Sequence, residues 1–147
     1  MKIRVLLVDD EEQFLGQLAE RLRLREYEVS TCLNGEEALE KVRKFNFDVC
    51  ILDVAMPCLD GIETLREIKR LKPLIEVIML TGHATVESAI EGMKLGAFDY
   101  LLKPTQTDDL VIKVETANKR KAEQEERIRR ARVKEIVLST RSVFSKE

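Results

Sequence analysis

Hydrophobic residues fall into short apolar runs that alternate with stretches of helical spacing, from the N-terminus to about residue 120. Residues 3–8, 49–52, 77–80 and 98–102 are mostly apolar, whereas residues 27–32 alternate between apolar and polar side chains. Near-continuous apolar runs are typical of strands that are covered on both faces of a sheet, and alternation is typical of a half-buried strand. The pattern therefore predicts five strands.

The stretches between these runs carry apolar residues at the 3.6-residue period of a helix. They cover residues 11–25, a segment after Asn34, a segment after Asp60, residues 86–95 before Gly96, and a segment that begins near Thr107. Asn34 is a plausible N-cap, and Gly96 stands at a C-cap position. Strands alternating with helices predict an α/β fold, a doubly wound parallel sheet. Its expected strand order is the flavodoxin-like 2-1-3-4-5.

Residues 119–134 are densely charged and contain neither Gly nor Pro, so the last helix is expected to continue through them. We divide the chain into a domain at 1–120 and a helical C-terminal extension at 121–147, whose weak periodicity from Ser139 is typical of a frayed end. Every third or fourth residue from 110 to 138 forms a heptad seam that Lys121 and Gln124 interrupt. The favoured interpretation is a signalling helix or marginal coiled coil, and the alternative is a solvated helix.

Charge and composition narrow the function classes. Residues 119–147 hold ten Lys and Arg against five Glu, which could suit nucleic acid, but no helix-turn-helix pattern is present. The net charge of the whole chain is only -2. We therefore expect no direct nucleic-acid binding and no attraction to acidic membranes. No apolar run reaches membrane-spanning length and the start lacks a signal-peptide pattern, so we expect a cytoplasmic protein.

Three cysteines, Cys32, Cys50 and Cys58, form no CxxC pair and have no partnering histidines. They are neither a disulfide framework nor a zinc site, and reduced thiols are expected. Cys58 could sense oxidants and His83 could act as a phospho-histidine or metal ligand. An incidental thiol and an ordinary loop residue are the favoured interpretations, because no partner group is evident for either.

Polar residues stand where the predicted strands end. The first strand ends at Asp9 and Asp10, the third at Asp53, the fourth at Thr81 and the fifth at Lys103. In the expected strand order these ends meet at one edge, where ligands of such sheets bind. Three neighbouring carboxylates repel one another unless a cation joins them, and oxygen ligands of this kind suit Mg²⁺. The sequence therefore predicts a magnesium site.

Asp53 lies at the centre of this set, with the other acids on one side and Thr81 and Lys103 on the other. An aspartate can act as a nucleophile toward phosphorus and form an acyl phosphate. Mg²⁺ and Lys103 would offset the charge on the transferring phosphoryl oxygens, and the Thr81 hydroxyl would donate to one of them. Asp53 is therefore the predicted phospho-acceptor.

Four stretches carry a family resemblance. They are residues 6–10 (Leu-Leu-Val-Asp-Asp), residues 48–53 (Asp-Val-Cys-Ile-Leu-Asp) with Met56-Pro57 and Asp60-Gly61, residues 80–82 (Leu-Thr-Gly), and residues 98–104 (Phe-Asp-Tyr-Leu-Leu-Lys-Pro). Over residues 3–120 the chain resembles the receiver domains of two-component response regulators. Residues 81–90 further resemble receivers that are attached to sigma-54-dependent activators.

The resemblance implies that a sensor histidine kinase or phosphotransfer protein phosphorylates Asp53. It implies that Asp10, Asp53 and the main-chain carbonyl of Ala55 bind Mg²⁺, with Asp9 near the metal or bound through water. It also implies signalling to an effector protein or to a second copy in a homodimer.

The resemblance assigns the switch to the other residues of the set. Thr81 moves toward the phosphoryl group and Tyr100 changes rotamer, so that the surface of the fourth helix, fifth strand and fifth helix changes. Lys103 bridges to the phosphate, and Pro104 sets its loop, often through a cis peptide bond.

The rival interpretation is a Mg²⁺-dependent phosphatase or phosphotransferase of the haloacid-dehalogenase kind, which also uses an aspartyl nucleophile. Members of that family carry an Asp-x-Asp motif at the nucleophile. In this chain Asp53 is followed by Val54 and Ala55, so the second acid is missing, and no cap insertion exists. The favoured interpretation is a phospho-acceptor switch that is not an enzyme on an external substrate.

Overall fold

The computed structural model describes residues 2–54, 60–82 and 85–145, with side chains as far as Arg141. In these ranges five strands form one parallel sheet in the order β2-β1-β3-β4-β5, so the predicted flavodoxin-like order is confirmed. The strands are β1 Arg4–Val8, β2 Glu28–Cys32, β3 Val49–Leu52, β4 Glu76–Thr81 and β5 Asp99–Leu102. The helices are α1 Glu12–Leu24, α2 Gly35–Lys44, α3 Gly61–Leu71, α4 Val86–Lys94 and α5 Thr107–Ser145.

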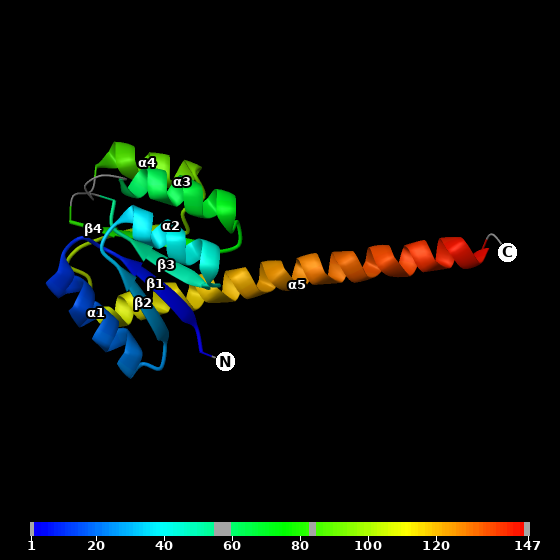
Figure 1. Cartoon of the computed structure of the whole chain (residues 1–147), viewed down its shortest axis with the longest axis horizontal. Coiled ribbons are helices and arrows are strands. Elements are labelled where there is room, and N and C mark those ends of the chain that lie inside the picture. The colour runs from blue at the N-terminus through cyan, green and yellow to red at the C-terminus, as the bar shows by residue number, and fades with distance from the viewer. Residues whose placement is uncertain (1, 55–59, 83–84, 146–147) are drawn as a thin grey trace.

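Helices cover both faces of the sheet (Figure 1), and side chains that alternate along each strand supply two separate cores. Leu6 and Val8 of β1 pack with α2 and α3, whereas Val5 and Leu7 pack with α1 and α5. Alternation follows from the two-residue period of a strand. Because both sets are apolar, the runs read as continuous, which is why the sequence identified the central strands.

Side chains accept hydrogen bonds from free N–H groups in the first turns of α2, α3 and α4. Asn34 accepts from the backbone N–H of Glu37, and Asp60 caps α3 in the same way. Thr85 and Ser88 form a capping box at the start of α4. These caps, together with Gly96 at a φ of 102° just after α4, confirm the predicted helix boundaries around the site.

Helix α5 is a single helix of 39 residues that projects well beyond the sheet (Figure 1). Its continuation through residues 119–134 is confirmed, and the weak periodicity from Ser139 does not end it before Ser145. Leu110, Val114 and Ala117 are buried in the domain, whereas all side chains from 127 to 141 are exposed. None of the helices in the described ranges combines the length and apolar character needed to cross a membrane.

Two ion pairs anchor α5 where it leaves the domain. The Lys121 ammonium is buried and lies 3.2 Å from a carboxylate oxygen of Asp48, and Arg120 lies 3.3 Å from Glu76. Asp48 and Glu76 stand at the N-terminal ends of β3 and β4. Lys121 therefore does not simply interrupt a seam for another helix, because it packs against its own domain.

Gly61 is the position where an added methyl group is least compatible with the fold. A Cβ there would lie 2.4 Å from the carbonyl oxygen of Asp53 and from Cα of Val54. We expect Gly61→Ala to reduce the free energy of unfolding by about 2–3 kcal/mol, because backbone must move to accept the methyl group. Gly16→Ala is the matched control, since nothing lies within 4 Å of its added Cβ. It should be neutral or stabilise α1 by about 0.5–1 kcal/mol. Urea unfolding measures both variants, and equal stability of the two would contradict the argument.

Candidate functional site

Asp9, Asp10 and Asp53 form one acidic cluster at the C-terminal edge of the sheet. One carboxylate oxygen from each lies within 4.8 Å of the others. The register of the strands produces this cluster, because Val8 and Leu52 are partners at the ends of β1 and β3. The backbone N–H of Asp53 donates to the carbonyl of Val8 over 2.9 Å and continues the ladder into the site. The structure thus brings together the three acids that the sequence singled out.

Two of the three carboxylates are buried. Asp9 and Asp53 are each 4% exposed, and Asp10 is exposed. Burial raises the pKa of Asp9, and the hydrogen bonds from Lys103 and from the backbone N–H of Glu11 only partly offset this effect. The charge of Asp53 raises the pKa of Asp9 further. Buried acids that repel one another and offer only oxygen atoms are a donor set that fits a hard divalent cation.

Lys103 lies against the acidic cluster. Its ammonium nitrogen is 2.7 Å from Asp9 Oδ2, 3.7 Å from Asp53 Oδ2 and 3.4 Å from Glu11 Oε1. Burial lowers the pKa of this ammonium, but its hydrogen bond to Asp9 and the nearby acidic charges outweigh burial, so the net pKa is raised. Lys103 therefore remains charged and supplies a positive charge next to Asp53.

The loop that carries Lys103 is tied to the neighbouring strand. The backbone N–H of Lys103 donates to the carbonyl of Thr81 over 2.9 Å, and the peptide bond between Lys103 and Pro104 is cis, as the resemblance implied. Thr81 is fully buried as the last residue of β4. Lys103 and Thr81 thus reach the acidic edge from adjacent strands.

Tyr100 lies on β5, which β4 separates from β3, and is half-buried. Its hydroxyl is 3.0 Å from Oγ of Ser88, which belongs to the capping box of α4. Ser88 was not among the predicted residues, although a Ser three residues after Thr85 fits the spacing of a capping box. Tyr100 therefore links β5 to the first turn of α4.

Phe14, which falls in the helix predicted at residues 11–25, is a second residue of the site that was not singled out from the sequence. Its ring centroid lies 4.1 Å from the Lys103 ammonium, a distance at which a cation is attracted to the face of the ring. The contact joins α1 to the loop after β5, which no local pattern could reveal.

The structure does not describe every predicted residue. Ala55, Met56, Pro57, Cys58 and His83 lie outside the described residues. Cys32 and Cys50 are free thiols, in agreement with the prediction. Burial raises the pKa of Cys32 to about 11 and also raises that of Cys50, so both remain protonated at neutral pH.

Comparison with known protein sequences places this geometry in a family. Residues 5–115 match the family described as response regulator receiver domain. The chain is 44% identical over 115 residues to the transcriptional regulatory protein ZraR of Escherichia coli K12, covering 78% of this chain and 26% of ZraR. It is 36% identical over 118 residues to the transcriptional regulatory protein PrrA of Mycobacterium leprae, covering 80% of this chain and 51% of PrrA. The chain thus spans a quarter to a half of these relatives.

Solved structures show the same fold. A CheY-like receiver domain from Methanospirillum hungatei JF-1 superposes with a TM-score of 0.82 at 28% identity, covering 84% of this chain and 99% of that one. A receiver domain from Clostridium thermocellum gives a TM-score of 0.78 at 39% identity, covering 82% and 97%. A response regulator from Burkholderia pseudomallei, solved with a phosphorylated aspartic acid and a calcium ion, gives 0.75 at 28% identity, covering 87% and 75%.

These matches favour the switch over the haloacid-dehalogenase interpretation, because they cover the strands, the acidic edge and the Lys103 loop together. The chain belongs to the receiver domains of two-component response regulators.

Proposed function

We propose that Asp53 accepts a phosphoryl group from a sensor histidine kinase or phosphotransfer protein. The observation that carries this proposal is the position of Asp53, whose buried carboxylate lies at a strand end beside two further acids and 3.7 Å from the Lys103 ammonium. The phosphorylated aspartic acid of the Burkholderia pseudomallei relative supports it.

The transfer requires one bond to form and one to break. A carboxylate oxygen of Asp53 attacks the phosphorus of a phosphohistidine, and the phosphorus–nitrogen bond breaks as the imidazole leaves with the electron pair and takes up a proton. The product is an acyl phosphate that carries close to two negative charges near pH 7. The Lys103 ammonium moves from Asp9 toward one phosphoryl oxygen, and the Thr81 hydroxyl donates a hydrogen bond to another.

Asp9, Asp10 and Asp53 are the residues that would hold Mg²⁺, with the carbonyl of Ala55 as a further ligand implied by the family. When bound, the ion offsets negative charge on the phosphoryl oxygens. The Lys103 ammonium can balance one of the three clustered charges, and a divalent cation would offset the other two.

The surface change begins with Thr81 and Tyr100. As Thr81 turns toward the phosphoryl group, Tyr100 changes rotamer and gives up its 3.0 Å contact with Ser88. Pro104 keeps the loop in register with the strand. Loss of the Ser88 contact loosens the first turn of α4 and changes the surface of α4, β5 and α5. Later hydrolysis at Asp53 resets the domain, so its chemistry is that of a switch and not of an enzyme on an external substrate.

This surface is apolar enough to bind another protein. Val86, Ile90, Leu102 and Ile112 are exposed on α4, β5 and α5. The binding partner is a second copy of the chain or an effector protein in the cytoplasm. The names of the relatives suggest an output in transcriptional regulation. No membrane or direct nucleic-acid contact by this chain is needed.

We further propose that residues 121–147 act as a helical extension that pairs weakly with another helix. Ile128 and Leu138, which belong to the predicted seam, are both exposed, and so are Val133, Ile136 and Val137. Since Lys121 packs on its own domain, the pairing surface begins beyond it. A seam with few apolar residues pairs weakly, so a small bias from the domain shifts it.

Phosphorylation of the chain by acetyl phosphate with Mg²⁺ should add the mass of one phosphoryl group, labile at high pH. Asp53→Asn should abolish the addition, because the amide is not a competent nucleophile. Asp60→Asn is the matched control, since asparagine also caps a helix and Asp60 lies outside the acidic cluster. Intact mass spectrometry reads all three proteins. Undiminished labelling of the Asp53 variant would disprove the assignment.

Magnesium should bind weakly to the unphosphorylated chain, and Asp10→Ala should remove most of the binding measured by calorimetric titration. Asp10 is the exposed acid of the cluster, so its loss leaves the buried acids in place. Glu12→Ala, on the exposed first turn of α1, is the control and should bind Mg²⁺ as the native chain does. Equal affinity in the Asp10 variant would contradict the ligand role.

The extension should give the full chain a dissociation constant in the micromolar range when a phosphoryl mimic such as beryllofluoride is bound, on the order expected for a small, poorly apolar interface. A chain ending after Glu126 keeps the Lys121 anchor and should remain monomeric. Sedimentation of both chains, each with and without the mimic, tests this. Identical monomers in all four samples would remove the dimer claim.

A further inference from the structure

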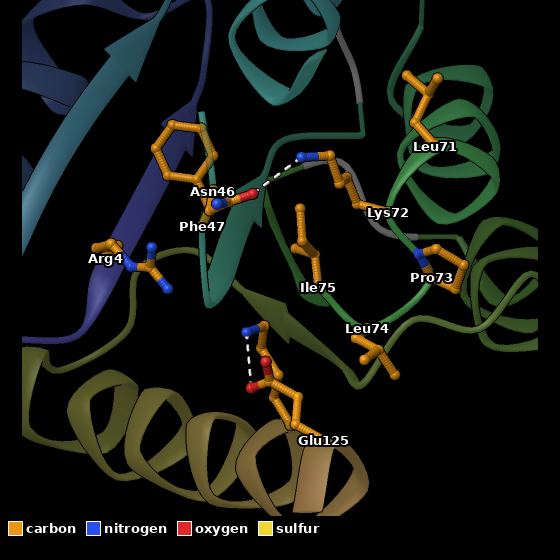
Figure 2. A pocket seen from close by; sticks show the side chains of 10 residues that line it. Arg4, Asn46, Phe47, Leu71, Lys72, Pro73, Leu74, Ile75 and Glu125 are labelled. Carbon is orange, nitrogen blue, oxygen red and sulfur yellow. Dashed lines mark hydrogen bonds and ion pairs between the residues drawn. The ribbon is translucent and has the colours of Figure 1, made fainter. Parts of the chain in front are cut away.

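A cavity of about 330 Å³ lies at the end of the sheet opposite Asp53. One wall is apolar and comes from the β3 entry and the turn between α3 and β4, namely Phe47, Leu71, Pro73, Leu74 and Ile75. Figure 2 shows Ile75 and Leu74 in the space between Lys72 above and Glu125 of α5 below. Its volume is at the lower end of cavities that hold small organic ligands.

The opposite wall is polar and holds hydrogen-bond donors that the fold does not use up. Nε and Nη2 of Arg4 donate hydrogen bonds to Asp48. Among the described residues, no acceptor is hydrogen-bonded to its Nη1. Lys72 donates to the side chain of Asn46 over 3.0 Å, which occupies one of three N–H donors. Figure 2 shows Arg4 and Lys72 extending from different elements toward the same space.

Lys121 completes this wall from the side of α5. Its ammonium is buried and bonds Asp48 over 3.2 Å and Glu125 over 3.0 Å, so one donor remains. Glu125 lies one helical turn further along, with a half-exposed side chain. Arg4, Lys72 and Lys121 are the cations that line the cavity, and Glu125 is the carboxylate that lines it. Asp48 pairs with Arg4 and Lys121 from outside the lining, so three cations against these two carboxylates leave one positive charge.

We propose that this cavity binds a small organic monocarboxylate with an apolar body. One surplus positive charge selects a monoanion, and Nη1 of Arg4 and the ammonium of Lys72 can donate to the oxygens of its carboxylate group. The apolar wall of Leu71, Leu74 and Ile75 takes the hydrocarbon part. This site is independent of phosphoryl transfer at the other edge of the sheet.

The ligand has a route to the helical extension. Its carboxylate competes with Glu125 for the ammonium of Lys121, which is the residue that anchors α5 where the helix leaves the domain. Releasing Glu125 changes the charge on the first exposed turns of the extension. A bound carboxylate therefore acts on the direction or pairing of α5 without contacting Asp53.

NMR titration of the full chain tests the proposal with hexanoate and with its uncharged analogue hexanamide. Hexanoate should shift the backbone amides of residues 47, 72, 74, 75 and 121–125 with saturation and a dissociation constant on the order of 1 mM. Hexanamide and inorganic phosphate should bind at least tenfold more weakly, because hexanamide lacks the charge and phosphate lacks the apolar body. Equal shifts with hexanamide, or tighter binding of phosphate, would overturn the proposal.

Lys72→Gln should weaken hexanoate binding by about tenfold, because one charge-assisted hydrogen bond is lost. The Lys72 ammonium bonds only Asn46 among the described residues, so the variant should keep the native spectrum elsewhere and its labelling by acetyl phosphate. Lys44→Gln is the control, since Lys44 is an exposed lysine that pairs with Glu40 outside this cavity. Unchanged affinity in the Lys72 variant, or no saturable shifts in the native chain, would exclude the site.

Discussion

Repulsion among the carboxylates of Asp9, Asp10 and Asp53 is the constraint on which the rest of this structure depends. The parallel register holds two of these acids out of water at the ends of β1 and β3, where their mutual charge is costly. Lys103 offsets part of that charge and is in turn held by the Thr81 carbonyl and the ring of Phe14. A site so short of positive charge is suited to take up a cation, and it can sense any change in charge on Asp53.

The two ends of the sheet carry different sets of charged residues. The C-terminal edge carries the acids and Lys103, and the N-terminal edge carries Asp48 and Glu76, which anchor α5. The backbone N–H, Nε and Nη2 of Arg4 and the ammonium of Lys121 all bond Asp48, and these bonds hold the pKa of its carboxyl below the ordinary value although burial alone would raise it. Breaking such a buried pair by removing one partner costs about 3–5 kcal/mol. The exposed part of α5 therefore leaves the domain from a firmly fixed point.

Much of the site could be predicted from the sequence because its residues follow directly after strands. Asp53 and Lys103 needed only the position of two apolar runs and the strand order to be placed together. Lys121 could not be predicted, because a lysine in a charged helix looks like a solvated residue. Its burial depends on Asp48, which is 73 positions away along the chain. The contact of Tyr100 with Ser88 and that of Phe14 with Lys103 depend in the same way on how separate elements pack.

The most direct test of the account is to locate the phosphoryl group chemically on the native chain. Reduction of the acyl phosphate by borohydride converts the modified aspartate to homoserine, which peptide mass spectrometry can assign to one position. The account predicts homoserine at position 53 alone, because the buried Asp53 lies beside both other acids and 3.7 Å from the Lys103 ammonium, whereas Asp9 is held by Lys103 at 2.7 Å. Homoserine at position 9 or 10, or at an acid outside the cluster, would contradict it.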